Sequence, residues 1–524
     1  MEKPSPAHML SLYTLSPIFE FAVDAAQTPE ESTNIPLVLS HVCDSWRQSA
    51  LRHAPLWTNI LLCVQDNQSL ERSAEFLGRS KTLPVRVTFD MQGAKEEPLG
   101  LKERVSFLAP YERRVRVLRI QGATNAIPIH RFLHDLDFTF TDLKDLEITW
   151  GKSTTPSARH FPVIFEGRVP KALLPYHLRL SPHDKFTNLT RFAMKTHEHR
   201  LSIQMDQLLE VLGNSPTLQH LEVEGFYLDY EDVEFYDDDD DDDDDDPDSE
   251  RSILQLPHLR FLSLSQCSSG AFLPRINVPA TTNVVLVAND PFMPNDSDIH
   301  DDPPSILYAL PPRFEELSFI GKFQSLDFEI RDSGITLRAS QSSGQYLLIE
   351  QVPDPGAFYN NTMEEMVLPS ATCFGNSDLG PVTTLKASNR LSEPNRGVLR
   401  DADPCEVGYW LLAMAGLEKL EIHYFPLNFL KSFAGDRDRQ QSPLAAKEIT
   451  LVLYPNECGD FKELKAWVES RAEAQIPFEK LEVTLDCSAP TTPPVDEKLV
   501  DSLRSSLAEY VKDVVVQVAY PPPQ

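Results

Sequence analysis

The sequence predicts an α/β protein in which a short helical module precedes an irregular solenoid of strand-containing repeats with one hairpin insertion. Three observations support this prediction. A chain of 524 residues is too long for one ordinary core, whereas a solenoid accommodates it as one continuous body. Hydrophobic residues make up 41% of the chain, which is enough to bury a sizeable core. A strand-like apolar pattern also recurs from residue 115 onward.

Short helices and strands are expected to alternate through the first ninety residues. Ser16-Pro17 has the form of a helix start, because the serine can cap and the proline lacks an N–H that would have no partner. Residues 27–34 read as a polar loop. A second helix is expected from about Pro36 to Pro55. Its apolar stripe follows helical spacing and consists of Leu39, Cys43, Trp46 and Ala50, so Cys43 reads as a core thiol.

A strand, a third helix and a second strand are expected next. Residues 60–64 form a short apolar run that predicts the first strand. Leu70, Ala74 and Leu77 share one side of a helix. The alternation from Val85 to Phe89 predicts a half-buried strand.

Part of this region resembles a known family. The segment 35–50, I-P-L-V-L-S-H-V-C-D-S-W-R-Q-S-A, is similar to the second half of an F-box, where V-C-x-x-W-R-x-x-A is typical. Residues 54–60, A-P-L-W-T-N-I, resemble the P-x-L-W-x-x-I tail of fungal F-box-like proteins. L-E-R-S at 70–73 and a proline-led strand at 83–87 follow, as in that family. The first helix lacks the proline and glutamate of the family's opening L-P-x-E.

This resemblance implies a non-catalytic substrate receptor of an SCF-type cullin–RING ubiquitin ligase. Residues 1–64 would be the F-box-like module that binds a Skp-type adaptor, and the adaptor would join the chain to a cullin scaffold. The adaptor-binding residues that the resemblance implies are Leu15, Ile18, Phe19, Leu39, Val42 and Trp46. Some of them must face the module's own core and others the adaptor, and the sequence does not show which residues belong to which group. The alternative is an F-box-derived interaction scaffold that no longer binds the adaptor.

One apolar pattern recurs through the rest of the chain, with apolar residues at the first, fourth and sixth positions. Its copies begin at residues 115, 143, 189, 218, 259, 314, 417, 478 and 511, and a weaker copy spans 449–453. Several spacings lie near 30 residues, which leaves room for a strand and a returning helix in each repeat. The region therefore resembles an irregular leucine-rich-repeat horseshoe. Helices are expected at 202–213, 409–415, 461–474 and 500–511. An ordinary α/β domain with a mixed sheet is the alternative.

These features predict a domain organisation. Residues 65–110 would connect the module to a repeat domain at 111–520. Ten consecutive aspartates at 237–246 predict a disordered acidic insertion over 237–250, because their mutual repulsion keeps the segment extended. Strand-like runs separated by turn residues predict a hairpin insertion at 323–351.

Charge and composition limit the partners. The formal net charge of −31 argues against binding to nucleic acid or an anionic membrane and favours a basic client protein. No secretory signal or spanning segment is evident, and the seven scattered cysteines read as reduced thiols of a cytoplasmic or nuclear protein.

No metal-ligand or catalytic pattern has the required spacing: the H-E-H at 197–199 fails, and so does the G-N-S-D-L-G at 375–380. No cofactor, metal or catalytic residue is therefore expected, and a hydrolase within the repeats is the least favoured alternative.

Overall fold

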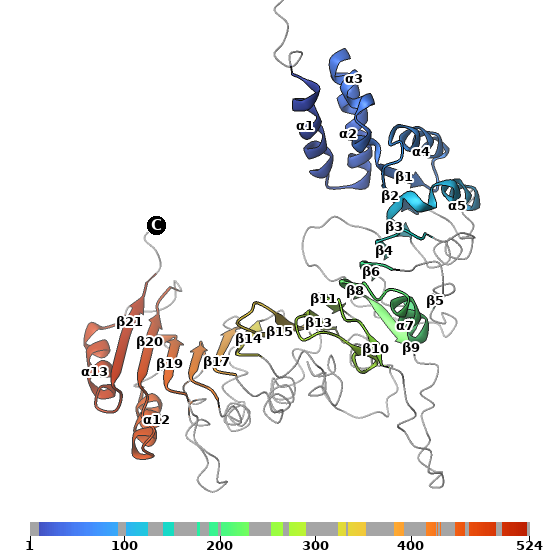
Figure 1. Cartoon of the computed structure of the whole chain (residues 1–524). Helices are drawn as coiled ribbons and strands as arrows, with labels where there is room; N and C mark the ends of the chain where they lie inside the picture. The colour runs from blue at the N-terminus through green and yellow to red at the C-terminus, as the bar shows by residue number, and fades with distance from the viewer. Residues whose placement is uncertain are drawn as a thin grey trace, which may run out of the picture. The chain divides into compact units, whose positions relative to one another are not determined.

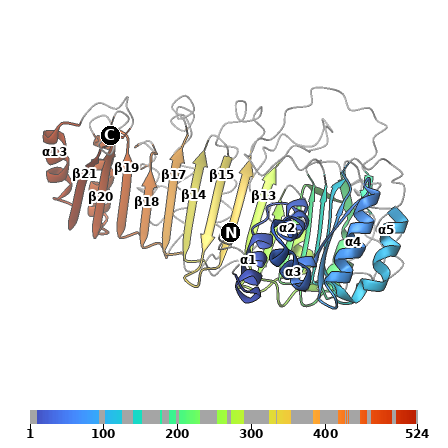
Figure 2. The same ribbon diagram turned by 90° about the horizontal axis from the view of Figure 1, so that it is seen from above.

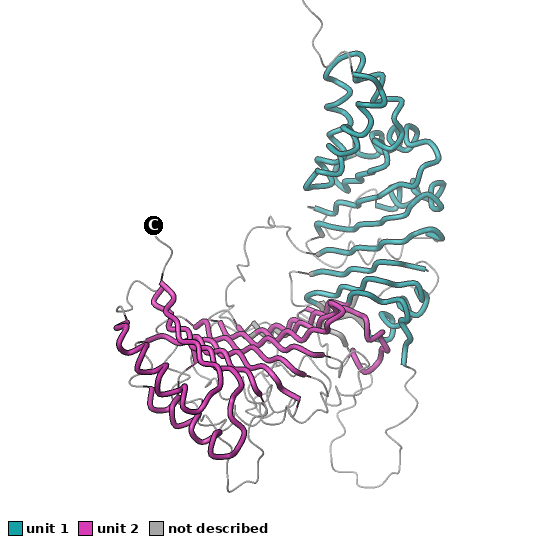
Figure 3. The backbone as a smooth tube through the Cα atoms, turned by 60° about the vertical axis from the view of Figure 1, so that its left-hand side comes forward, with its two compact units in different colours: residues 1–261 teal, residues 262–524 magenta. Residues whose placement is uncertain are grey.

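The protein is described here from a computed structural model (Figure 1). The structure describes residues 10–92, 101–123, 140–150, 176–178, 188–196, 201–229, 253–265, 272–289, 323–331, 334–352, 382–391, 416–425, 427, 430, 446–455, 461–488 and 495–520. Packing divides the chain into two compact units, Met1–Phe261 and Leu262–Gln524 (Figure 3). The sequence-based boundaries at 64 and 110 stay predictions.

The first unit joins helices to parallel strands. Its helices are α1 (Leu12–Asp24), α2 (Pro29–Val42), α3 (Asp44–Arg52), α4 (Asn67–Arg79), α5 (Leu101–Leu108) and α7 (Met205–Gly213), with 3-10 turns η2 (Ala54–Trp57) and η3 (Ala109–Arg114). Its main sheet has the order β1 (Asn59–Cys63), β2 (Val85–Asp90), β3 (Val115–Ala123), β4 (Asp145–Trp150), β6 (Arg191–Thr196) and β8 (His220–Glu224). A small parallel sheet has the order β5 (Tyr176–Leu178), β7 (Leu201–Gln204) and β9 (Phe226–Asp229), and β10 is Leu254–Gln255.

Helix α1 begins five residues earlier than the sequence predicts. The N-cap is Ser11, whose hydroxyl accepts a hydrogen bond from the backbone N–H of Thr14. Ser16 lies inside the helix, where its hydroxyl donates to the carbonyl of Leu12. The predicted start at Ser16-Pro17 is therefore wrong, because an equally good capping serine precedes it and Pro17 is accommodated within the helix.

The prediction of a loop at 27–34 is also wrong, because α2 begins within this segment, at Pro29. Thr28 caps the helix by accepting from the backbone N–H of Glu31, and the Glu31 carboxylate accepts in return from the N–H of Thr28. This reciprocal capping box, together with Pro29 in the first turn, starts the helix seven residues before Pro36.

The single helix expected from Pro36 to Pro55 is broken at Cys43. This residue is extended (φ −162°, ψ 172°) and is the N-cap of α3, with its sulfur accepting from the N–H of Trp46. Cys43 is half-buried and does not lie on a helical stripe, so its assignment as a core thiol is wrong. Helices α1, α2 and α3 pack on one another as a small bundle (Figures 1 and 2).

Helix α4 covers β1, the edge strand of the first unit's main sheet. The Ser73 hydroxyl donates to the carbonyl of Leu61, and the Ser69 hydroxyl accepts from the N–H of Cys63. An edge strand otherwise presents unpaired backbone groups that invite pairing with another chain. The serine of the L-E-R-S segment is thus a cap on the sheet edge.

Replacing Ser73 with alanine is expected to lower the free energy of unfolding of the first unit by about 1–2 kcal/mol. Ser73 is 1% exposed, and its loss leaves the Leu61 carbonyl without this donor. Urea denaturation of the full chain measures the change. Glu71→Gln, an exposed position on the same helix, is the matched control, and an equal loss in both variants would contradict the capping role.

One face of the first unit's main sheet is polar and carries a row of paired charges. Glu147 on β4 lies between Arg119 on β3 and Arg191 on β6, with its carboxylate 3.2 Å and 3.1 Å from the two guanidinium groups. Glu222 on β8 is 2.7 Å from the Lys195 ammonium. Acids and bases therefore alternate across neighbouring strands, and the described acids of this row are neutralised by bases.

Acid is expected to destabilise the first unit through Glu222. The His220 imidazole, 3.6 Å away, and the closer Lys195 ammonium hold the pKa of Glu222 down to about 2, from an ordinary value of 4.5. A carboxyl whose pKa is lower in the folded state contributes stability above its ordinary pKa and loses it as the pH falls through the folded pKa. We therefore expect stability to fall between pH 4.5 and about 2.

Denaturation of the wild type and Glu222→Gln at a series of pH values tests this. The variant is expected to lose about 1–3 kcal/mol at neutral pH and to show a shallower loss of stability in acid. Equal slopes in the two proteins would show that Glu222 carries none of the acid sensitivity.

The second unit is built around a mainly parallel sheet. The strands of the unit are β11 (Phe261–Ser265, from the last residue of the first unit), β12 (Ile276–Asn277), β13 (Asn283–Asn289), β14 (Ser325–Arg331), β15 (Gly334–Ser340), β16 (Tyr346–Val352), β17 (Thr384–Arg390), β18 (Lys419–His423), β19 (Glu448–Leu453), β20 (Lys480–Asp486) and β21 (Asp513–Ala519). All of these strands except β12 belong to this sheet. The helices described in this unit are α12 (Lys462–Glu473) and α13 (Glu497–Leu507), with the 3-10 turn η4 (Leu273–Arg275).

The antiparallel strands of the hairpin insertion expected at 323–351 are confirmed, and they are built into the sheet. β14 pairs antiparallel with β15, and β15 pairs antiparallel with β16. β16 also pairs parallel with β13, and β14 pairs parallel with β17. The sequence did not reveal the outer pairings, because alternation along a strand does not identify its neighbours.

The recurring apolar pattern marks strands wherever the structure describes it. In each described copy the last two apolar residues lie inside a strand: β3, β4, β6, β8, β11, β18, β20, β21 and, for the weaker copy, β19. The copy at 314 lies outside the described residues, as do the helix expected at 409–415 and the acidic run. The helices expected at 461–474 and 500–511 correspond to α12 and α13. The helix expected at 202–213 is correct only from Met205, because Leu201–Gln204 is strand β7.

Candidate functional site

Exposed apolar side chains gather on the helical bundle. Eight of the twelve large apolar side chains that stand exposed among the described residues belong to its three helices or the turn before them. They are Leu10, Leu12, Tyr13, Ile18, Phe21, Val38, Val42 and Leu51. The most exposed are Tyr13 at 92% and Phe21 at 76%. Single exposed apolar residues are ordinary, but a concentration on one small element is typical of an interaction surface.

Helix α1 has two apolar faces. Leu15, Phe19 and Val23 recur at four-residue spacing and are buried in the bundle. Tyr13 and Phe21, eight residues apart, lie on another side of the helix and face solvent. A soluble helix needs one buried stripe, so the second is free for a partner.

The structure divides the six residues that resemblance assigned to the adaptor. Leu15 and Phe19 are fully buried, so neither is available for direct contact. Leu39 and Trp46 are half-buried, and the Trp46 ring packs 5.1 Å from that of Phe19. Ile18 and Val42 are about half exposed and can meet a partner directly.

Sequence reasoning missed Tyr13, Phe21 and Val38. The spacing of the apolar residues does separate the two faces of α1, but only when the helix is taken to begin after Ser11. From Ser11 onward, residues 15, 19 and 23 form the inner stripe and residues 13 and 21 the outer one. Val38 was missed because the expected helix was aligned on a stripe from Leu39 through Cys43, whereas the structure ends α2 at Val42.

Trp57 links the helical bundle to the sheet through contacts with α3 and α4. Its indole N–H donates to the carbonyl of Ala50 on α3 at 2.8 Å, and its ring meets Phe76 of α4 edge-on. The guanidinium of Arg79 lies 4.4 Å above the same ring. The P-x-L-W segment is therefore the structural joint between α3, β1 and α4.

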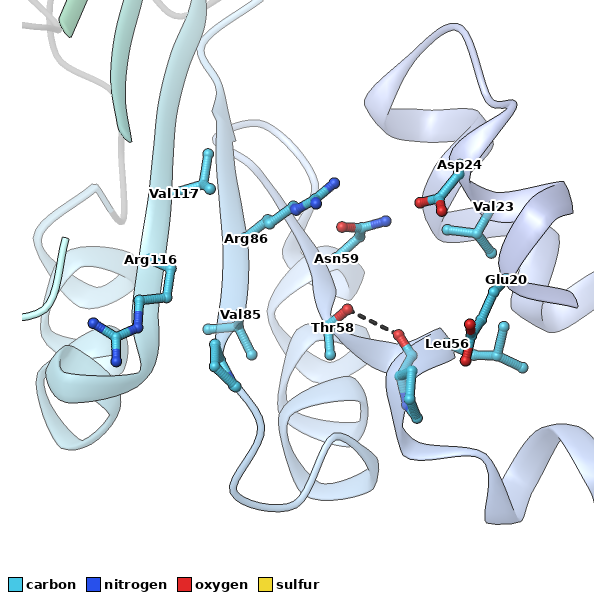
Figure 4. A pocket seen from close by; sticks show the side chains of 12 residues that line it. Glu20, Val23, Asp24, Leu56, Thr58, Asn59, Val85, Arg86, Arg116 and Val117 are labelled. Carbon is cyan, nitrogen blue, oxygen red and sulfur yellow. Dashed lines mark hydrogen bonds between the residues drawn. The ribbon is translucent and has the colours of Figure 1, made fainter. Parts of the chain in front are cut away.

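A cleft of about 450 Å³ lies between the last turns of α1 and the first residues of β1, β2 and β3 (Figure 4). Its lining residues are Glu20, Val23, Asp24, Pro55, Leu56, Thr58, Asn59, Pro84, Val85, Arg86, Arg116 and Val117. The carboxylates come from α1 and the guanidinium groups from the sheet. The lining therefore combines apolar side chains with a few charged groups, and such a combination can orient a small ligand.

The second unit carries one row in which a carboxylate, a hydroxyl and an imidazole meet. Glu329, Ser388 and His423 lie directly opposite one another on β14, β17 and β18. Ser388 is 2% exposed, and among the described atoms its hydroxyl has no hydrogen-bond partner, so no base activates it. Burial lowers the pKa of His423. This row supports no nucleophilic chemistry.

An aromatic pair lies near this row. The rings of Tyr424 and Tyr454 stack at 4.5 Å, and the Tyr424 hydroxyl donates to the Asp486 carboxylate at 2.8 Å. Burial, together with the hydrogen bond to Asp486, raises the pKa of Tyr424 well above its usual range. Both rings are half-buried, so the stacked pair is partly accessible to a partner.

Comparison with known proteins adds no family. No protein-family model matches this sequence, and no curated protein matches it. Within the described ranges, no group of three or more His, Cys, Asp and Glu side chains is arranged to hold a metal ion. None of the helices in the described part of the chain is long and apolar enough to cross a membrane.

Proposed function

We propose that this protein is a non-catalytic substrate receptor of an SCF-type ubiquitin ligase. The helical bundle binds a Skp-type adaptor, and the strand-rich remainder, an irregular leucine-rich-repeat-like solenoid, holds a client protein. The chain's contribution is effective concentration, because it keeps a client lysine close to the charged ubiquitin carrier.

The observation that carries the adaptor half of the proposal is the exposed apolar set on α1–α3. Burial of apolar surface releases about 25 cal/mol per Å², so Tyr13, Phe21, Val38 and Val42 can drive association once covered. Among the six residues assigned by resemblance, Ile18 and Val42 remain direct contacts in this proposal. Leu15 and Phe19 hold α1 in place from beneath.

The client half rests on the rows of side chains along the second unit's sheet. Parallel strands in register present rows of side chains, and tyrosine is enriched at protein interfaces, so Tyr424 and Tyr454 are candidate client contacts. A basic client remains part of the proposal because of the net charge of −31. The first unit's row of paired charges does not supply that preference, since its acids are already neutralised by bases.

Capture of a Skp-type adaptor by the full-length chain tests the proposal. The wild type is expected to retain the adaptor, and Tyr13→Asp/Phe21→Asp is expected to lose it, because each aspartate places a charge in an apolar interface. Leu499→Asp/Val515→Asp, at exposed apolar positions of the second unit, is the matched control and should bind normally. Failure of the wild type to bind would favour the second candidate, an F-box-derived scaffold without the adaptor, which the absent L-P-x-E opening supports.

A further inference from the structure

The cleft of Figure 4 holds two opposite charges that do not neutralise each other. Asp24 is the last residue of α1, and Arg86 extends from β2 toward the α1 wall. Both residues are exposed. Among the described residues, neither side chain makes a hydrogen bond or an ion pair. The cleft therefore offers an anion site and a cation site that are both open.

The flanking charges of the cleft are already engaged. Glu20 is fixed by the His53 imidazole, whose Nε2 lies 2.6 Å from its carboxylate. The Arg116 guanidinium donates to the carbonyl of Asp142 at 2.8 Å and lies 3.3 Å from its carboxylate. Arg86 and Asp24 are thus the two charges left to bind a ligand.

The position of Asp24 is unfavourable for the helix itself. A carboxylate at a helix C-terminus faces the negative end of the helix dipole, and the last turn of α1 contains no basic residue. Helix stability therefore does not account for this acid, whereas the binding of a cation in the cleft would.

We propose that this cleft binds a small zwitterion, an α-amino acid with an apolar side chain. Its carboxylate pairs with the Arg86 fork, which suits two parallel hydrogen bonds, and its ammonium group pairs with Asp24. The side chain lies against Pro55, Pro84 and Val117, the apolar lining residues that are not buried, and about 450 Å³ is ample for such a molecule. This binding activity is separate from adaptor capture. A bound ligand joins α1 to β2 and so stabilises the first unit.

Calorimetric titration of the full chain with free L-leucine, isoleucine, valine, methionine and phenylalanine tests the proposal. At least one is expected to bind and to raise the melting temperature. Its N-acetyl and amide derivatives, which lack the ammonium and the carboxylate charge respectively, should bind at least about tenfold more weakly.

Matched variants distinguish the cleft from general charge effects. Arg86→Gln and Asp24→Asn are each expected to weaken binding by at least about tenfold without loss of stability, because both side chains are exposed. Arg72→Gln and Glu71→Gln on α4 make the same charge changes outside the cleft and should bind as the wild type does.

Three results would overturn the proposal. They are no binding by any of the five amino acids, binding of the blocked derivatives as tight as that of the parent, and unchanged binding in Arg86→Gln. Preferential binding of the blocked derivatives would instead identify the occupant as a peptide segment.

Discussion

Phe19→Ala is expected to lower the free energy of unfolding of the first unit by about 3–5 kcal/mol, whereas Phe21→Ala should change it by less than about 0.5 kcal/mol. The two phenylalanines are two residues apart on α1, yet Phe19 is fully buried and Phe21 is 76% exposed. Removing the Phe19 ring leaves a cavity against Trp46, whose ring packs 5.1 Å away. Removing the Phe21 ring creates no cavity, because most of its surface is already in contact with solvent.

Urea denaturation with hydrogen exchange of α1–α3 measures both variants. The pair forms its own control, because the same chemical change is made on two faces of one helix. Equal losses in the two variants would mean that the outer face of α1 is covered by the chain itself, which would remove the basis for a docking surface.

Trp57→Ala is expected to cost a similar amount, about 3–5 kcal/mol, and to loosen the bundle from the sheet. The side chain is fully buried, and its removal also leaves the Ala50 carbonyl without its donor and the Arg79 guanidinium without a ring beneath it. Trp57→Phe retains most of the ring and should lose less, chiefly the hydrogen bond, worth about 1 kcal/mol.

Hydrogen exchange resolves where the Trp57→Ala effect falls. Faster exchange is expected in α3, β1 and α4, whose residues contact or flank the indole, and unchanged exchange is expected in α12 and α13 of the second unit. A uniform increase over both units would contradict the role of Trp57 as a local joint.

The strands were more predictable from sequence than the helix boundaries. The recurring apolar pattern reports burial of alternate side chains, which is a local property of every parallel strand here, so its described copies all fall on strands. Helix ends depend on which of several capping residues is used. Ser11 and Thr28 are the caps in use, and choosing Ser16 and Pro36 instead obscured the outer face of α1 and the first half of α2.

The candidate sites were less predictable because they combine residues that are distant in sequence. Arg86 and Asp24 come from different elements, and nothing in the sequence near either residue indicates the other. Resemblance identified the bundle but could not separate Phe19, in its core, from Ile18 on its surface. That separation depends on the packing of three helices. The pairing partners of β14 and β16 were hidden for the same reason.

Hydrogen exchange of the full chain with and without a purified Skp-type adaptor tests the central claim most directly. A complex is expected to slow exchange in α1 and α2, where Tyr13, Phe21, Val38 and Val42 become covered, and to leave α12 and α13 unchanged. The absence of any change at α1 and α2 at saturating adaptor would contradict the claim that this surface is the docking site.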